Sequence, residues 1–436
     1  MMGAIAMSHP CSLKVLGHAL LLSLSMLTAA CAEQPATDNA THSTAASQPP
    51  APPSSTATTE PAQAPVSFAE WREQFRIEAL AQGISPRTFD QAFAGISPDP
   101  AVLRADSSQP EFTRPVWEYL QSAASPTRVR SGQAKLQQEQ ANLAAIQQQY
   151  AVEAPYLVAV WGLESNYGQF MGEQSVIRSL ATLAYAGRRQ AFAHSQLLAA
   201  LGILQQGDIQ ASSMRGSWAG AMGQTQFIPT TFNTHAVDFD GDGRRDIWNS
   251  SADALASAAH YLQASGWRSG QPWGFEVQLA KNFDYALADP DNRRSVREWQ
   301  AIGVITAAQD AQLADAQAAL VLPAGYRGPA FLVLDNFRAI LKYNNSTSYA
   351  LAVGLLGDRL QGRGEIRAAW PLDEKPLSRS QRIELQDRLS ARGLNPGPAD
   401  GIIGANTRKA VRAFQQSQGW PADGYPTLHL LQRLQE

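Results

Sequence analysis

Cysteine is almost absent from this chain of 436 residues, which contains only Cys11 and Cys31. Both lie near the start, so the remaining sequence cannot hold a disulfide framework, a thiolate metal site or a cysteine nucleophile. A long basic run is also missing, and the net charge of −3 makes nucleic acid a poor partner. The length predicts two folded units with extensions, and the 44% hydrophobic content provides for a buried core.

Residues 1–30 have the features of a secretory signal peptide. Their apolar run, 19–27, is too short to span a bilayer as a mature helix, and small residues follow at 28–30. The end of this segment, together with Cys31, resembles a bacterial lipobox, whose cysteine is lipidated after cleavage. Ordinary cleavage before the cysteine is the alternative, and both readings predict export from the cytoplasm.

The residues after the predicted cleavage site indicate where the mature protein resides. Ala32, in place of Asp, directly follows Cys31 and favours sorting to the outer membrane. We therefore expect a periplasmic lipoprotein anchored to the outer membrane. Residues 31–66 are rich in Ala, Thr, Ser, Gln and Pro and contain no Lys or Arg, so we predict a disordered tether.

Periodic sequence begins at Phe68 and indicates mostly helices. Helical patterns recur at 68–80, 136–150, 156–163, 188–205 and 253–264, and residues 273–280 alternate like a strand. We therefore predict a mainly α (α+β) domain with a small β element at 67–370. A short linker at 371–377 precedes a small three-helix domain at 378–436.

A glutamate at the end of an apolar helix is the sharpest chemical signal. The segment 161–168 reads Trp-Gly-Leu-Glu-Ser-Asn-Tyr-Gly, so Glu164 stands where apolar helical sequence meets residues that stop a helix. A carboxyl group in such a place tends to be desolvated, which raises its pKa and suits it to donate a proton. The spacing alone leaves open an ordinary surface glutamate near a helix end.

A glycine-rich segment at 216–232 interleaves three glycines with Trp, Gln and Phe. Such a backbone can approach a ligand closely while it presents amides and aromatic faces, which is how sugar rings are bound. A packing loop between helices is the alternative on this segment alone.

An aspartate-rich segment at 238–249 matches the start of an EF-hand calcium loop. Asp238, Asp240 and Asp242 occupy positions 1, 3 and 5, and a glycine follows at position 6. Position 7 would contribute the backbone carbonyl of Arg244, and position 12 is Asn249 instead of the usual glutamate. An aspartate-rich turn without metal is the alternative, and a single loop argues against a calcium sensor.

These segments together resemble the membrane-bound lytic transglycosylase B family, which has a lysozyme-like fold. The resemblance runs from about residue 66 to residue 370. It rests on the motifs Glu164–Gly168, Ser217–Gly223, Gln226–Pro229 and Lys342–Ala350, in this order.

The resemblance implies a role for each matching residue. Glu164 is the catalytic acid and then the base, and Ser217 and Asn344 are polar groups around the bond that is cut. The glycan groove is lined by Arg188, Arg189, Gln226, Phe227, Tyr261, Tyr343 and Tyr349, with Tyr119 as an addition. The structural calcium ion takes Asp238, Asp240, Asp242, Arg244, Asp246 and Asp253, the last of which closes a lengthened loop. No organic cofactor is expected.

The C-terminal segment resembles the small helical peptidoglycan-binding domain of many wall enzymes. The match rests on residues 400–404 and on Thr407, Ala410, Val411, Phe414 and Gln415. Asn406 or Thr407 is placed to cap the helix that follows. We expect this domain to raise the concentration of substrate near the active site, with a purely structural appendage as the alternative.

The resemblance therefore implies a lytic transglycosylase that cleaves the β-1,4 bond between MurNAc and GlcNAc in peptidoglycan. The C6 hydroxyl of MurNAc attacks its own C1 and leaves a 1,6-anhydro end, so one carboxylic acid suffices. A hydrolytic muramidase and a catalytically inactive wall-binding scaffold are the alternatives. The expected partners are glycan strands and a membrane, with cell-wall synthases as candidates.

Overall fold

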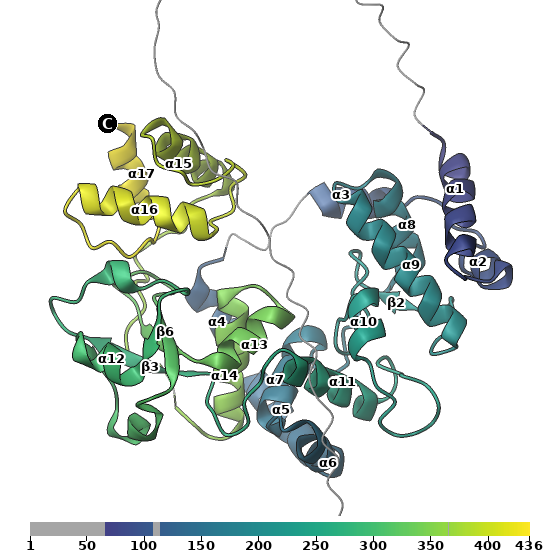
Figure 1. Cartoon of the computed structure of the whole chain (residues 1–436), viewed down its shortest axis with the longest axis horizontal. Helices are drawn as coiled ribbons and strands as arrows, with labels where there is room; N and C mark the ends of the chain where they lie inside the picture. Colours follow the sequence, from purple (N-terminus) through teal and green to yellow (C-terminus); the bar gives the residue numbers. More distant parts are fainter. Residues whose placement is uncertain (1–65, 108–113, 365) are drawn as a thin grey trace, which may run out of the picture. The chain divides into compact units, whose positions relative to one another are not determined.

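The structure is a computed structural model that describes residues 66–107, 114–364 and 366–436 (Figure 1). The predicted signal peptide, Cys31 and nearly all of the predicted tether lie outside the described residues. Within the described ranges, no helix combines the length and the apolar character that crossing a bilayer requires.

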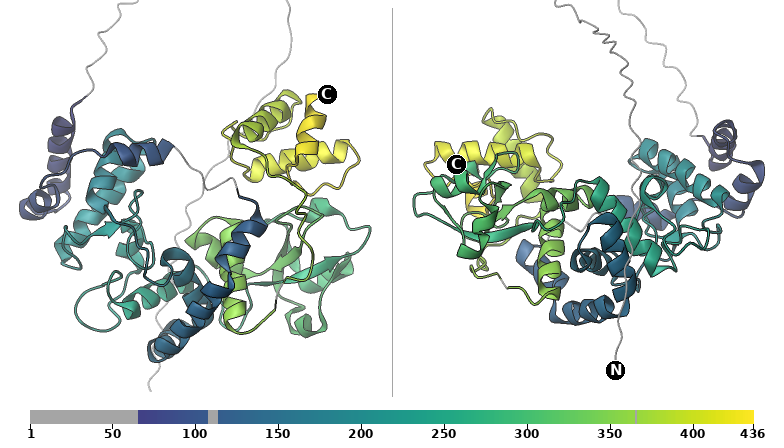
Figure 2. Two further views of the ribbon diagram at one scale, coloured as in Figure 1. Left: turned by 180° about the vertical axis from the view of Figure 1, so that it is seen from behind. Right: turned by 60° about the horizontal axis from the view of Figure 1, so that its bottom comes forward.

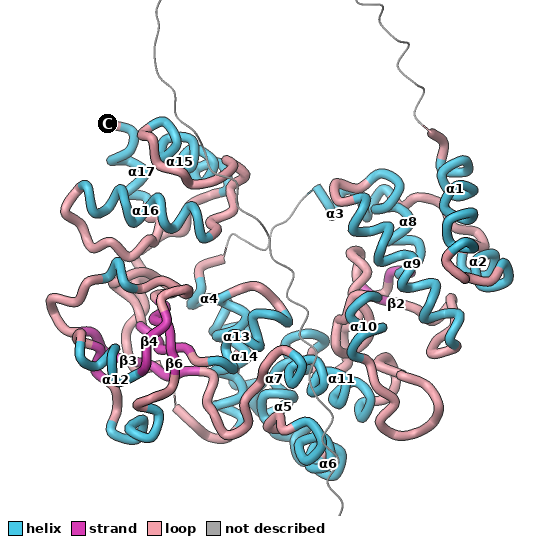
Figure 3. Tube along the Cα trace, in the orientation of Figure 1, coloured by secondary structure: helices cyan, strands magenta, loops and turns pink. Residues whose placement is uncertain are grey.

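The described residues form seventeen α-helices, which Figure 3 shows in cyan. In chain order they are α1 (Phe68–Ala81), α2 (Pro86–Ala92), α3 (Pro100–Ser107), α4 (Val116–Ala123), α5 (Pro126–Gln138), α6 (Gln140–Tyr150), α7 (Ala154–Ser165), α8 (Val176–Ala186), α9 (Gln190–Gln206), α10 (Pro229–His235), α11 (Ser251–Ala264), α12 (Val296–Ala301), α13 (Asp335–Tyr343), α14 (Thr347–Leu360), α15 (Arg379–Ala391), α16 (Ala405–Ser417) and α17 (Leu428–Gln435).

The strands form two antiparallel sheets. Two short strands pair in the first sheet, β1 (Gln174–Ser175) and β2 (Arg215–Gly216). The second sheet has the order β4-β6-β7-β3-β5, with β3 (Gly274–Leu279), β4 (Arg293–Ser295), β5 (Val304–Ile305), β6 (Gln317–Val321) and β7 (Ala330–Val333). The alternating segment at 273–280 is therefore a strand, as predicted.

The predicted helices exist, but two of their boundaries differ. The pattern at 136–150 is interrupted at Glu139, where α5 ends and α6 begins, because this residue leaves the helical conformation (φ −97°, ψ 15°). Apolar periodicity continues across the break, since Leu143 and Ile146 pack into the same core as the partly buried Leu136. The helix predicted from Arg188 begins at Gln190, because Arg189 is its N-cap residue and has a non-helical backbone (φ −121°, ψ 55°).

Helix α7 lies at the centre of the largest hydrophobic core. Eight of its twelve residues are buried, and it packs against α14, α5 and α11. A helix that is apolar on all sides belongs in the interior of a domain. Gly357 of α14 permits the close packing, because a Cβ there would lie 2.4 Å from the ring of Tyr156 on α7. The catalytic candidate Glu164 is therefore held at the end of a rigid, buried element.

Separate cores hold the other parts together. One gathers α1, α2, α8, α9 and α10 around side chains such as Phe75 and Leu197, and another lies between the second sheet and α12 around Trp299. The three C-terminal helices enclose their own core around Leu385 and Val411, and both views of Figure 2 show them in yellow.

The cap predicted for α16 is wrong by two to three residues. Its N-cap residue is Gly404, which has no side chain to bond, and Asn406 and Thr407 lie inside the first turn. The hydroxyl of Thr407 is buried and instead donates to the carbonyl oxygen of Pro396 at 2.9 Å. The threonine thus fastens the preceding loop to the helix rather than capping it.

Candidate active site

Glu164 is the penultimate residue of α7 and is followed by an unusual turn. Asn166, Tyr167 and Gly168 all have left-handed backbone conformations, with φ of 48°, 62° and 82°. Two of the three are not glycine, so the turn is strained. Tyr167 anchors it, since its buried ring packs edge-on against Trp161 and its hydroxyl donates to the carbonyl oxygen of Arg128 at 2.8 Å. The turn ends the helix beside the glutamate.

The carboxyl group of Glu164 is held ready to carry a proton. Burial raises its pKa from the ordinary 4.5 to about 7, and the hydrogen bond that Tyr349 donates to Oε1 opposes the shift. Tyr349 belongs to α14 and is itself buried. At neutral pH the protonated acid and the carboxylate are therefore both populated, as a group that must donate and then accept a proton requires.

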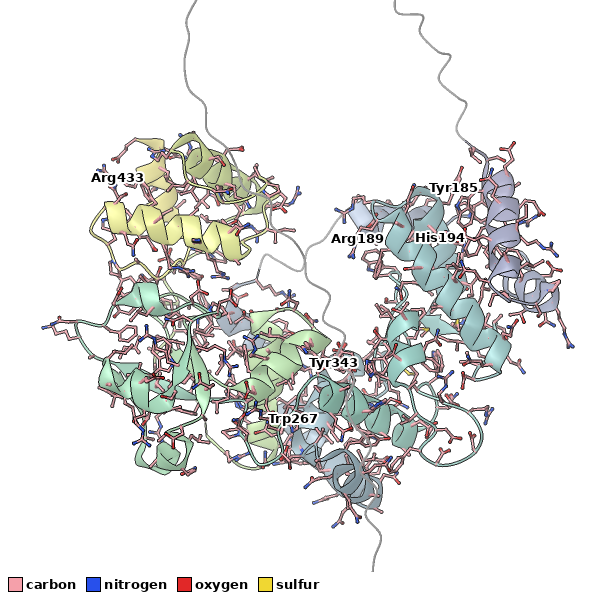
Figure 4. The ribbon with its side chains drawn as sticks, viewed as in Figure 1. Tyr185, Arg189, His194, Trp267, Tyr343 and Arg433 are labelled. Atoms are coloured by element: carbon pink, nitrogen blue, oxygen red, sulfur yellow. The ribbon has the colours of Figure 1, made fainter. Side chains whose placement is uncertain are left out.

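Aromatic residues from four further elements gather around this pair. Tyr343 (labelled in Figure 4), at the end of α13, lies 5.0 Å from Tyr261 and 5.7 Å from Phe227 between ring centroids. Burial raises the pKa of Tyr343 well above its ordinary value, and the charge of nearby Glu164 adds to the effect. The charge of Tyr119, on α4, slightly raises the pKa of Tyr349. The structure therefore brings these predicted groove residues together with the acid.

The glycine-rich segment forms a tight loop with its polar groups in fixed positions. The hydroxyl oxygen of Ser217 accepts from the backbone amides of Ala219 and Ala221, at 3.3 and 3.0 Å, which leaves its own proton free to donate. Gln226 has a left-handed backbone (φ 51°), and its amide donates to the carbonyl oxygens of Met171 and Gly223. The side chain of Gln226 thus joins the loop to the segment after Glu164.

Three other predicted substrate-binding residues have different surroundings. Arg188 donates from its backbone and its guanidinium to Asp106, at 2.9 and 3.4 Å. The guanidinium of Arg189 lies over the ring of Phe192, 4.3 Å from its centroid. Asn344 is exposed and directly follows Tyr343. Asn344 is thus adjacent to the aromatic group, whereas the two arginines are bound at the start of α9.

Two residues that shape the site were not predicted from the sequence. The buried Gln224 accepts a hydrogen bond from Trp161 Nε1 at 2.9 Å, and its amide leaves no room for a side chain at Gly168. The hydroxyl of Ser165 accepts from the backbone of Gly168 at 2.9 Å. Ser165 lies inside the motif Glu164–Gly168 and Gln224 inside the glycine-rich segment at 216–232, but only the folded backbone shows that they support the turn after Glu164.

The aspartate-rich loop gathers three of its predicted calcium ligands. One carboxylate oxygen each from Asp238, Asp240 and Asp253 lies within 4.8 Å of the other two. Asp242 is paired with Arg244 at 2.7 Å, and Asp246 accepts hydrogen bonds from residues 248 and 249. Three converging hard oxygen donors fit calcium.

Comparison with known proteins identifies relatives that cover more than half of this chain. Membrane-bound lytic murein transglycosylase B of Escherichia coli (strain K12) is 31% identical over 243 residues, which cover 55% of this chain and 65% of that protein. SltB3 from Pseudomonas aeruginosa, solved in complex with NAG-anhNAM-pentapeptide, is 65% identical with a TM-score of 0.83, covering 85% of this chain and 100% of that chain. The Escherichia coli lytic transglycosylase Slt35, solved in complex with calcium, is 27% identical with a TM-score of 0.60, covering 66% of this chain and 92% of that chain.

These similarities confirm the predicted lysozyme-like, mainly α fold and the helical C-terminal domain. The peptidoglycan-binding domain family matches residues 378–434. Since the transglycosylase SLT domain family matches residues 67–358, more than half of the sequence, the chain belongs to that family, as its motifs predicted.

Proposed function

We propose that this chain is a lytic transglycosylase that cleaves the β-1,4 bond between MurNAc and GlcNAc in peptidoglycan and leaves 1,6-anhydro-MurNAc ends. Family membership supports this function. The 65% identity to SltB3, which was solved with NAG-anhNAM-pentapeptide, supports the anhydro product. Its role would be the remodelling of the cell wall.

The observation that carries the proposal is that, among the described residues, Tyr349 and no carboxylate is the recorded hydrogen-bond partner of the Glu164 carboxyl group. Only burial and Tyr349 shift the pKa of Glu164, and no other carboxylate of the described residues contributes. Glycosidases that hydrolyse their substrate typically use two carboxyl groups, one of which activates water or attacks the sugar. A lone acid suffices where the sugar supplies its own nucleophile.

The geometry supports two proton transfers by the same group. The protonated Glu164 donates to the glycosidic oxygen as the bond from that oxygen to C1 of MurNAc breaks. The acetamido oxygen of the sugar supports the positive charge at C1, as in substrate-assisted glycosidases. The C6 hydroxyl then bonds to C1 and returns its proton to the carboxylate, which the hydrogen bond from Tyr349 stabilises in the meantime.

Replacement of the acid tests the proposal. Glu164→Gln keeps nearly the same volume and cannot donate the proton, so turnover of purified sacculi should fall by roughly 10²–10⁴-fold or more. Product mass spectrometry of the wild type should show anhydro ends, one water lighter than hydrolysis products.

Reaction in heavy-oxygen water separates the proposal from a muramidase. The anhydro ends of the wild type should carry no label at C1, because water is not the nucleophile. Reducing ends that bear solvent oxygen would show that the enzyme is a hydrolytic muramidase. An inactive wild type would indicate instead that the protein is a wall-binding scaffold without catalytic activity.

A structural calcium ion is proposed for the aspartate-rich loop. Asp238, Asp240 and Asp253 would hold it, with the backbone carbonyl of Arg244 as a further ligand. The convergence of the three carboxylates supports this, as does the solved complex of Slt35 with calcium. The ion would order the segment between α10 and α11 and take no part in proton transfer.

Anchoring at the outer membrane through a lipid on Cys31 is likewise a proposal. The lipobox resemblance supports it, and the Escherichia coli relative is described as membrane-bound. Fractionation of cells that produce Cys31→Ser tests it, since the variant should leave the membrane fraction. The C-terminal domain is proposed to bind peptidoglycan, as its family match indicates.

A further inference from the structure

The segment after Glu164 is held more firmly than a connection between helices requires. It begins with the three left-handed residues Asn166, Tyr167 and Gly168. A left-handed conformation costs an ordinary residue roughly 1 kcal/mol or more, so it persists only where surrounding contacts impose it. Here the bonds of Tyr167 to Arg128 and of Ser165 to Gly168 impose it.

The following residues are tied to the catalytic helix and to the glycine-rich loop. The backbone amide of Phe170 donates to the carbonyl oxygen of Ser165 at 2.9 Å. The carbonyl oxygen of Met171 accepts from Gln226 at 3.0 Å. Gly172 passes so close to Gly216 that a Cβ on it would lie 2.2 Å from that carbonyl oxygen. The backbone of Phe170 is thus fixed between the end of α7 and the glycine-rich segment at 216–232.

The side chain of Phe170 contrasts with its rigid backbone. It is 71% exposed, the most exposed aromatic side chain in the described part of the chain. Exposed apolar residues are common and need no explanation one by one. Phe170 differs because its exposed ring belongs to a backbone segment that is hydrogen-bonded to the helix carrying Glu164 and is followed by residues held against the glycine-rich segment.

We propose that Phe170 is a sugar-binding platform of the active site, on which one pyranose ring of the glycan strand stacks. This inference rests on the proposed function, since it assigns a further binding residue to the same site. The C–H face of a pyranose is apolar and covers an aromatic ring well. Because the backbone of Phe170 is already ordered, stacking costs little conformational entropy. Phe170 lies outside the sequence motifs that imply the roles of the other site residues.

Kinetics of Phe170→Ala on purified glycan strands test the proposal in the full-length chain. Loss of one stacking contact should raise KM about three- to tenfold. It should change kcat by less than about twofold, because the sugar is held equally in the ground and transition states. Phe170→Trp should restore the wild-type KM, since it retains a flat aromatic face. Ile77→Ala, which removes another exposed apolar side chain on α1, should leave both constants unchanged.

Binding of the same strands to Glu164→Gln and to the double variant with Phe170→Ala gives a second measurement, and the dissociation constant should rise by the same factor. An unchanged KM and dissociation constant, with an active wild type, would overturn the platform and leave the proposed function intact. Absence of anhydro products from the wild type would overturn the proposed function instead. If Phe170→Ala has a lower melting temperature than the wild type, Phe170→Leu replaces it in the test. This variant keeps an apolar side chain without the ring face and must show the rise in KM.

Discussion

Burial of the Glu164 carboxyl group affects stability as well as catalysis. An ionised carboxylate loses hydration when it is buried, and here only the hydroxyl of Tyr349 compensates among the described residues. The folded state therefore favours the protonated form, which matches the proton donor that the proposed reaction needs. A site built in this way is expected to be less stable than the same fold with a neutral residue.

The pH dependence of stability should show this cost. The pKa of Glu164 rises from 4.5 in the unfolded chain to about 7 in the folded one. Its contribution to the free energy of unfolding is therefore fully present below pH 4.5 and is lost as pH rises through 7. Over this pH range the free energy of unfolding should fall by up to about 3 kcal/mol. Glu164→Gln stays neutral, so its melting temperature should exceed that of the wild type at pH 8 and match it near pH 4.

Calorimetry at the two pH values checks this expectation. Glu118→Gln, which removes an exposed carboxyl group from α4, is the control for the general effect of charge. An equal difference between Glu164→Gln and the wild type at both pH values would show that the carboxyl group is not desolvated.

At the scale of an element, the aspartate-rich loop is organised around one buried side chain. Asp253 of α11 is fully buried, and its carboxylate accepts from the backbone amides of Phe239 at 2.8 Å and of Asp246 at 2.8 Å. These bonds close the loop between α10 and α11. Burial raises the pKa of Asp253, and a bound cation would favour its ionised form. The loop is therefore expected to be more stable with calcium.

Calcium should raise the melting temperature of the wild type, and EDTA should reverse the effect. Binding to the native state alone stabilises it by about 2.7 kcal/mol at a hundredfold excess over the dissociation constant. Asp240→Ala should abolish the response, because it removes one of the three converging oxygens. Asp315→Ala, which removes an exposed carboxylate, should respond like the wild type. Identical melting curves with calcium and EDTA would exclude the ion.

At the scale of the whole molecule, the C-terminal domain is docked on the sheet region rather than merely tethered. Arg412 of α16, almost fully buried, forms an ion pair with Asp289 and donates to the carbonyl oxygen of Ala288. Asp423 accepts from the backbone amide of Tyr326 at 2.8 Å. The segment between the domains is also held, since Asp373 pairs with Arg327 at 2.7 Å. These contacts join the C-terminal domain to the region of the second sheet.

Removal of residues 378–436 tests the role of this domain. Soluble short glycans should be cut at nearly the wild-type rate, because no residue of the gathered site lies in the deleted part. Binding to insoluble sacculi should weaken, since the second attachment to substrate is lost. The melting temperature should fall moderately, because Asp289 and Tyr326 lose their partners. Equal binding of the truncated and complete chains to sacculi in a sedimentation assay would leave only a structural role.

Local signals in the sequence determined several features of this protein. The apolar run that ends at Glu164 made this residue a candidate acid, because a helix that is apolar on all sides must be buried. The resemblance of the surrounding motifs to a known family then implied its role. Strong periodicity placed α1, α11 and β3 to within a few residues, since each repeats its apolar positions at the spacing of its own secondary structure. The ordered set of motifs determined the family.

Only the tertiary structure decided which groups act on the acid. Tyr349 lies 185 residues from Glu164 along the chain, and no local pattern shows that its hydroxyl reaches the carboxylate. The ion pair of Arg412 with Asp289, which joins regions on either side of the predicted short linker, is equally invisible in the sequence. Periodicity reports which face of an element is buried, whereas contacts between distant elements depend on how all those faces pack at once.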